Sequence, residues 1–161
     1  WGSVMRAREG MRAARVKLQI QRDVRRARRR NWEAARRAAP QARVVGVFAR
    51  PTPEQSAVLD GLSGRDDVDL SVLYTAAGDG TAPSHTHWVM RSTTIRGHRV
   101  NYMILRALAR LHPDVVLVGG GTGFAGRAAE AWCKLLRVPC LAVEAASLDA
   151  DAVVRAAGRA A

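Results

Sequence analysis

The sequence predicts an α/β domain with a Rossmann-like parallel sheet, covered by helices on both faces and preceded by a basic α-helical N-terminal arm. Two observations lead to this prediction. From residue 43 onward, short apolar segments alternate with amphipathic ones, which is typical of a parallel sheet covered by helices. The positive charge is concentrated in residues 1–43, which hold 14 Lys and Arg and only 3 acidic residues, whereas the remaining residues have a net charge of +1.

The arm is predicted to be helical because residues 3–39 have no proline and are rich in Arg and Ala, two good helix formers. Apolar residues between Val16 and Ala27 recur at helical spacing and form one narrow stripe. We therefore predict a basic helical arm over residues 1–41 and a Rossmann-like α/β domain over residues 42–161.

Three uses of the arm remain open. The first is electrostatic attachment to an anionic membrane surface, and the second is binding of nucleic acid through the phosphates. In the third, the arm is a solvated helix upstream of the true start, because the chain begins with Trp1 rather than Met. No apolar run approaches the ~18 residues that cross a bilayer, so we expect a cytoplasmic protein, with peripheral membrane attachment as the first use of the arm.

The elements of the domain are predicted in order. The apolar run 43–49 is the first strand, and Thr52-Pro53-Glu54-Gln55 has the residue types of a capping box that opens a helix over 53–63. The later expected elements are a strand at 68–75, a loop at 76–86, an extended segment at 87–95, a helix at 101–111, a strand at 114–120, a helix at 122–136, a strand at 139–145 and a helix from Asp149 to Arg159.

A glycine-rich loop follows the strand at 114–120. The six residues Gly121–Gly126 match G-x-G-x-x-G, and Glu144 lies 23 positions after Gly121, where a dinucleotide-binding unit has its ribose-binding acid. That fingerprint normally opens the first strand–helix unit, whereas two or three strands precede it here. Three interpretations remain open: a dinucleotide site, a site for an anionic or hydroxyl-rich ligand, and a turn that serves only packing.

Four stretches carry a resemblance to a known family: VVGVFARPTPEQSAVLDGL, VDLSVLYT, LARLHPDVVLVGGGTG and LLRVPCLAVEAASL. In this order they resemble the N-terminal half of a GT-B fold glycosyltransferase of the retaining type, and they cover roughly two-thirds of the chain. The resemblance implies that this domain binds a hydroxyl acceptor. It also implies that a donor domain beyond Ala161, typically with a Glu-x₇-Glu pattern, binds the nucleotide-sugar.

The resemblance implies a substrate-binding cleft lined by nine residues. They are Arg50, Thr52, Glu54, Gly119, Gly120, Gly121, Thr122, Glu144 and Ser147. For Thr52 and Glu54, helix capping is an equally good interpretation, and Glu144 is equally well a surface acid at a strand end. The catalytic residues stay unassigned, and we expect neither a metal nor a cofactor. Without the donor half, the chain is expected not to transfer sugar.

Other polar and aromatic residues are given structural interpretations. His85 and His87 are expected to be solvated loop residues, because an H-T-H pair alone is too small a ligand set for a metal. Trp88 is expected in the core. Cys133 and Cys140 are expected to be buried free thiols.

Overall fold

The chain divides into two units, residues 1–38 and 39–161. The structure is a computed structural model that describes residues 26, 30, 41–78, 83–95, 98–101, 103–144 and 148–158. The predicted basic arm lies outside these residues except for Arg26 and Arg30, which are helical and exposed, so the arm stays a prediction. None of the helices in the described part is both long and apolar enough to cross a membrane.

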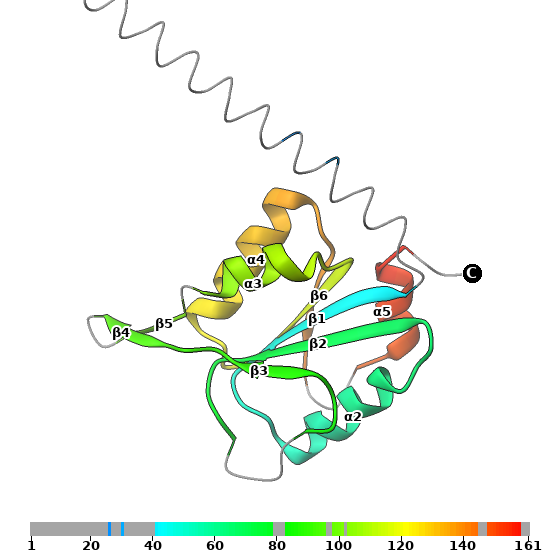
Figure 1. The fold of residues 1–161 in the computed structure, drawn as a ribbon, viewed down its shortest axis with the longest axis horizontal. Helices are drawn as coiled ribbons and strands as arrows, with labels where there is room; N and C mark the ends of the chain where they lie inside the picture. Colours follow the sequence, from blue (N-terminus) through cyan, green and yellow to red (C-terminus); the bar gives the residue numbers. More distant parts are fainter. Residues whose placement is uncertain are drawn as a thin grey trace, which may run out of the picture. The chain divides into compact units, whose positions relative to one another are not determined.

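The second unit contains a five-stranded parallel sheet with the strand order β3-β2-β1-β6-β7 (Figure 1). The strands are β1 (Ala42–Phe48), β2 (Val68–Tyr74), β3 (His87–Val89), β6 (Val115–Gly119) and β7 (Cys140–Val143). β1 is central, and its Val44 pairs with Leu70 on one side and with Val115 on the other. The predicted Rossmann-like parallel sheet is therefore confirmed.

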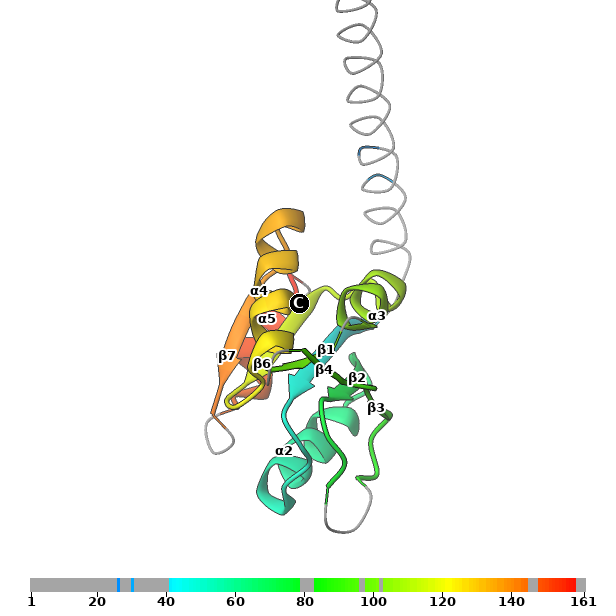
Figure 2. The ribbon, with the colours of Figure 1, turned by 90° about the vertical axis from the view of Figure 1, so that its left-hand side faces the viewer.

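Helices cover both faces of this sheet (Figures 1 and 2). One face carries α2 (Pro53–Ser63) and α5 (Ala150–Ala156), and the other carries α3 (Met103–Leu111) and α4 (Phe124–Leu136), which pack against each other. Successive side chains of a strand point to opposite faces, so an apolar run can supply two cores at once. This explains why β6 and most of β1 read as continuous apolar segments rather than as alternating ones.

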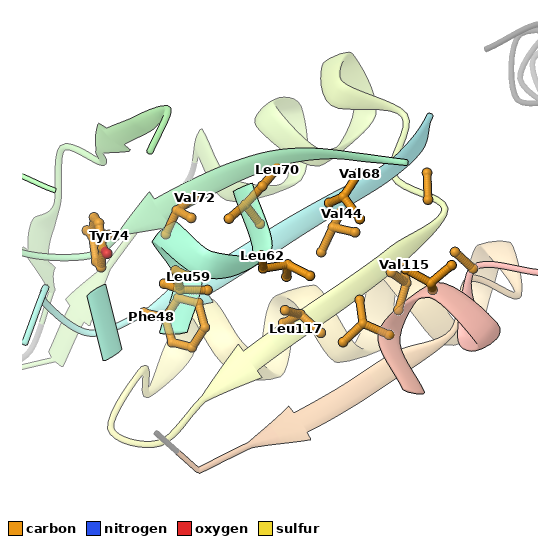
Figure 3. Close-up of a cluster of buried hydrophobic side chains, with 14 residues drawn as sticks. Val44, Phe48, Leu59, Leu62, Val68, Leu70, Val72, Tyr74, Val115 and Leu117 are labelled. Atoms are coloured by element: carbon orange, nitrogen blue, oxygen red, sulfur yellow. The ribbon is translucent and has the colours of Figure 1, made fainter. Parts of the chain in front are cut away.

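The core between the sheet and α2 is seen in Figure 3. Val44 and Phe48 of β1 pack there with Leu59 and Leu62 of α2. The intervening residue Val45 is equally buried, but it faces the side of the sheet that α3 and α4 cover.

One predicted element is wrong in its form. The extended segment expected at 87–95 is two separate strands, because β3 joins the parallel sheet and β4 (Thr93–Ile95) pairs antiparallel with β5 (His98–Val100). This hairpin lies apart from the main sheet and leads into α3 (Figure 1). The other predicted elements are present, and their ends differ from the expected ones by a few residues.

Candidate functional site

The sheet has a point at which its winding reverses. From β1 the chain continues through α2 to the neighbouring strand β2, whereas from β6 it continues through α4 to β7 on the opposite side. β1 and β6 are neighbours in the sheet, and the connections that follow them leave in opposite directions. A crevice therefore forms at the carboxyl ends of these two strands, and ligands of open α/β sheets bind in such crevices.

A pocket of about 520 Å³ lies at this position. We call it the switch-point pocket; the described residues that line it are Ala49, Arg50, Thr75, Ala76, Val100, Asn101, Gly121, Thr122, Gly123, Phe124 and Arg127. They come from the ends of β1, β2 and β5 and from the turn that opens α4. The volume is in the range of small-molecule sites, which measure about 300–1,000 Å³.

One side of the pocket is built by the turns that follow β1 and β2. The Thr75 hydroxyl donates a hydrogen bond to the Ala49 carbonyl at 3.0 Å, and the Ala76 amide donates to the same carbonyl at 2.8 Å. The pairing of β1 and β2 thus continues one residue beyond the strands. Arg50 therefore leaves the sheet from a backbone that is held in place.

The opposite side is the turn between β6 and α4. Gly121 and Gly123 have φ angles of 74° and 56°, in the left-handed region that favours glycine. The Thr122 hydroxyl donates to the Gly119 carbonyl at 3.0 Å and fixes the turn. Among the described residues no side chain caps the N-terminus of α4, and the Ala125 amide donates to the Thr122 carbonyl at 3.2 Å.

The glycines of this loop differ in whether the surrounding atoms leave room for a side chain. A Cβ on Gly119 would overlap the Phe48 ring, and one on Gly126 would overlap the Thr122 hydroxyl and lie 3.1 Å from Val118 Cγ1. Packing therefore accounts for Gly119 and Gly126, which leaves the three interpretations of the loop open. Around Gly120, by contrast, a Cβ would meet nothing within 4 Å.

The charge of the described lining is entirely positive. Arg50 and Arg127 contribute guanidinium groups, and no Asp or Glu occurs among the described lining residues. Asn101 is 2% exposed, and its amide nitrogen donates to the carbonyls of Met90 and Arg91 at 3.4 and 3.3 Å. These bonds tie Asn101, which lies between β5 and α3, to the segment that connects β3 with β4.

The structure brings together some of the predicted site residues and leaves others apart. Arg50, Gly121 and Thr122 line the switch-point pocket, and Gly119 and Gly120 directly precede that turn. Thr52 caps α2, because its hydroxyl accepts a hydrogen bond from the Gln55 amide at 3.4 Å.

Two further predicted residues, Glu54 and Glu144, are not among the described lining residues. Glu54 lies exposed in the first turn of α2, and Glu144 lies exposed directly after β7. Ser147 lies outside the described residues.

Sequence reasoning missed Thr75, Asn101, Phe124 and Arg127 as pocket residues. Thr75 had a signal, because it ends a predicted strand at the edge where ligands bind. Arg127 had one too, since it directly follows the glycine pattern. Asn101 had none, because its position depends on the hairpin that the sequence did not predict.

A second polar cluster consists of Asp60, Tyr74 and His85. It shows that the expectation of a solvated His85 is wrong. His85 is 3% exposed rather than solvated; its Nδ1 lies 2.6 Å from Asp60 Oδ1 and its Nε2 lies 3.0 Å from the Tyr74 hydroxyl. His87 is half-buried, with Nδ1 3.0 Å from the His85 carbonyl oxygen. Trp88 is 45% exposed, so its expected place in the core is also wrong.

This cluster has the residue types of a proton relay, but Tyr74 and His85 are buried and Asp60 is only partly exposed. Tyr74 has no exposed surface, and burial raises the pKa of its hydroxyl despite a hydrogen bond with Ser56. The cluster therefore acts as a structural clamp between α2, β2 and the following loop. Within the described ranges, no three His, Cys, Asp or Glu residues are arranged to hold a metal ion.

The two cysteines are neighbours in space. The hydrogen bond from Cys133 to Cys140 raises the pKa of Cys133, as does burial, and the same bond lowers the pKa of Cys140. Cys133 is buried in α4, whereas Cys140 is half-buried at the start of β7. We therefore expect Cys140 to be the more reactive thiol of the pair.

Comparison with known proteins identifies no relative of this chain. No protein-family model matches the chain, and neither the curated proteins nor the solved structures include a match.

Proposed function

We propose that the chain is the acceptor-binding half of a GT-B fold glycosyltransferase that transfers a sugar from a nucleotide-sugar to a hydroxyl acceptor. The observation that carries this proposal is a convergence in space. Of the four stretches that resemble the family, three supply lining residues to the switch-point pocket, namely those that contain Arg50, Thr75 and Gly121. The proposal places the acceptor in this pocket and the nucleotide-sugar on a second domain.

The polar groups of the pocket suit a ligand with several hydroxyl groups. The hydroxyl protons of Thr75 and Thr122 are used in bonds to backbone carbonyls, so their oxygens keep lone pairs that accept hydrogen bonds from a ligand. The guanidinium groups of Arg50 and Arg127 supply donors. A sugar or polyol needs both kinds of partner at close spacing.

The test is residue-resolved binding by the full chain. ¹⁵N-labelled protein is titrated with neutral sugars and polyols, and we expect amide resonances of Gly121, Thr122 and Ala76 to shift together. Separately, radiolabelled nucleotide-sugars are incubated with the chain and the same acceptors, and we expect no transfer. If no sugar or polyol of the panel moves the pocket amides, the acceptor role is wrong. If the chain alone transfers sugar, the proposed division of labour between two domains is wrong.

A second candidate function is dinucleotide binding, and one observation favours it. Gly121 has the positive φ of a tight turn and Gly126 allows close packing of α4 on β6, which are the roles of the first and third glycines of the fingerprint. Against it, Glu144 is not part of the pocket lining. Micromolar binding of NAD⁺, NADP⁺ or FAD that is weakened by Glu144→Ala, but not by the exposed control Glu130→Ala on α4, would establish this candidate instead.

For the basic arm, we propose attachment to an anionic membrane surface, on the evidence of its charge. Each Lys or Arg near such a surface contributes about 1 kcal/mol. The chain should sediment with vesicles that contain phosphatidylserine and not with neutral vesicles, and deletion of residues 1–40 should abolish this. Stronger binding to RNA or DNA than to the anionic vesicles at equal salt would favour the nucleic-acid role instead.

A further inference from the structure

We infer that the ligand of the switch-point pocket carries an anionic oxygen group, phosphoryl or carboxylate, in addition to its hydroxyl groups. This inference rests on the proposed function only in calling the ligand an acceptor. It deepens that function by stating the chemical class of the acceptor.

The charged side chains in the described lining of the pocket are both positive. Arg50 reaches the pocket from the end of β1 and Arg127 from α4, so the two guanidinium groups come from different elements. No carboxylate is found among the described lining residues. Planar guanidinium groups bind phosphoryl and carboxylate groups through paired, charge-assisted hydrogen bonds.

Arg127 lies close to the N-terminus of α4. Arg127 is the fourth residue of α4, and the first turn of α4 contains no acidic residue. A cation near a helix N-terminus is unfavourable, because the backbone dipoles already make that end positive. An anion bound beside Arg127 offsets both contributions, because it places negative charge at that end of the helix.

The pocket is larger than an anionic group alone requires. The pocket holds about 520 Å³, which exceeds the space that one phosphoryl or carboxylate group fills. The remaining space borders Thr75 and Asn101, whose polar groups suit hydroxyls. The ligand is thus a hydroxyl-bearing molecule that places its anionic end beside Arg127.

The experiment must be resolved by residue, because residues 1–43 carry 14 bases and would bind anions regardless of the pocket. Inorganic phosphate and acetate are titrated into ¹⁵N-labelled full chain, and shifts are followed at the amides of Gly121, Thr122 and Phe124. We expect saturable shifts at these amides, with phosphate and acetate as separate arms that identify which anionic group binds better. Arg127→Gln should weaken this binding by about tenfold, the equivalent of one charge-assisted bond.

The matched control is Arg110→Gln, an exposed arginine near the end of α3 that is not in the pocket lining. It should change pocket binding by less than twofold. Two results overturn the inference: pocket amides that neither anion moves, or an equal loss of binding in both variants.

The two proposals fail in different ways. Pocket amides that respond to neutral polyols but not to phosphate or acetate overturn the anionic group and leave the acceptor function intact. Amides that respond to phosphate or acetate but to no sugar or polyol overturn the acceptor function and retain the anion site.

Discussion

His85 Nδ1 lies 2.6 Å from Asp60 Oδ1, and the same oxygen accepts a hydrogen bond from the His85 backbone amide at 3.1 Å. A carboxylate only accepts hydrogen bonds, so Nδ1 carries a proton and donates it to Asp60. In the neutral form of the ring, Nε2 then accepts from the Tyr74 hydroxyl, 3.0 Å away. One acidic side chain of α2 thereby fixes the position, the orientation and the tautomer of a buried imidazole.

Asp60→Ala should destabilise the protein by about 1–3 kcal/mol, because the buried His85 Nδ1–H would lose its acceptor. The measurement is urea unfolding at neutral pH. Asp69→Ala, which removes an exposed carboxylate from β2, is the matched control and should change the free energy of unfolding by less than about 0.5 kcal/mol. Equal effects of the two substitutions would mean that the clamp is not a source of stability.

The contribution of Asp60 should depend on pH in the acid range. Burial raises the pKa of Asp60, but hydrogen bonds from His85 and Ser84 outweigh burial and hold the pKa below its ordinary value of 3.8. A depressed folded-state pKa gives a stabilisation that is complete above the unfolded-state pKa and is lost as the pH falls through the folded-state pKa. The difference in unfolding free energy between the wild type and Asp60→Asn should therefore shrink below about pH 4. A difference that stays constant down to the lowest pH at which both proteins fold would contradict this pKa shift.

Gly119→Ala should destabilise the domain by about 1–3 kcal/mol, because its Cβ would overlap the Phe48 ring at the end of β1. Gly120→Ala places a Cβ in open space and should change stability by less than about 0.5 kcal/mol. Both are measured by thermal and urea unfolding. Adding Phe48→Leu to Gly119→Ala should cost less than the sum of the two single changes, because the smaller side chain makes room. Additive effects would show that the overlap is not the cause.

Cys140 should react with iodoacetamide faster than Cys133. The hydrogen bond from Cys133 lowers the pKa of Cys140 against the effect of burial, and Cys140 is the less buried of the two. Peptide mass spectrometry after short exposures at neutral pH measures both rates. Cys133→Ala removes the hydrogen bond and should slow the reaction of Cys140, whereas a faster reaction would mean that burial by Cys133 controls the reactivity.

Much of the fold could be predicted because its signals are local. Val44–Val47 and Val115–Val118 are buried on both faces of the sheet and read as uninterrupted apolar runs. The start of α2 followed from the Thr52 cap and the proline after it. The order of these elements then restricts the chain to a parallel sheet with helices on both faces.

The rest depends on contacts between distant residues. Thr93–Ile95 is too short and polar to signal a strand, and the only local sign of the hairpin is Gly97 in the two residues between the paired Ile95 and His98. The burial of His85 depends on Asp60, which lies 25 positions earlier in the chain. No periodicity connects two such positions, so sequence reasoning placed this histidine in solvent.

The pairing of β1 with β6 has a consequence for how a ligand can be found. Arg50 and Gly121 become neighbours in one pocket only when these two strands are joined, so the unfolded chain offers no equivalent site. A small molecule that occupies this pocket must raise the melting temperature of the domain by mass action, and at 100 times its Kd it adds about 2.7 kcal/mol. A thermal-shift screen of metabolite libraries can therefore identify the natural ligand before any activity is known.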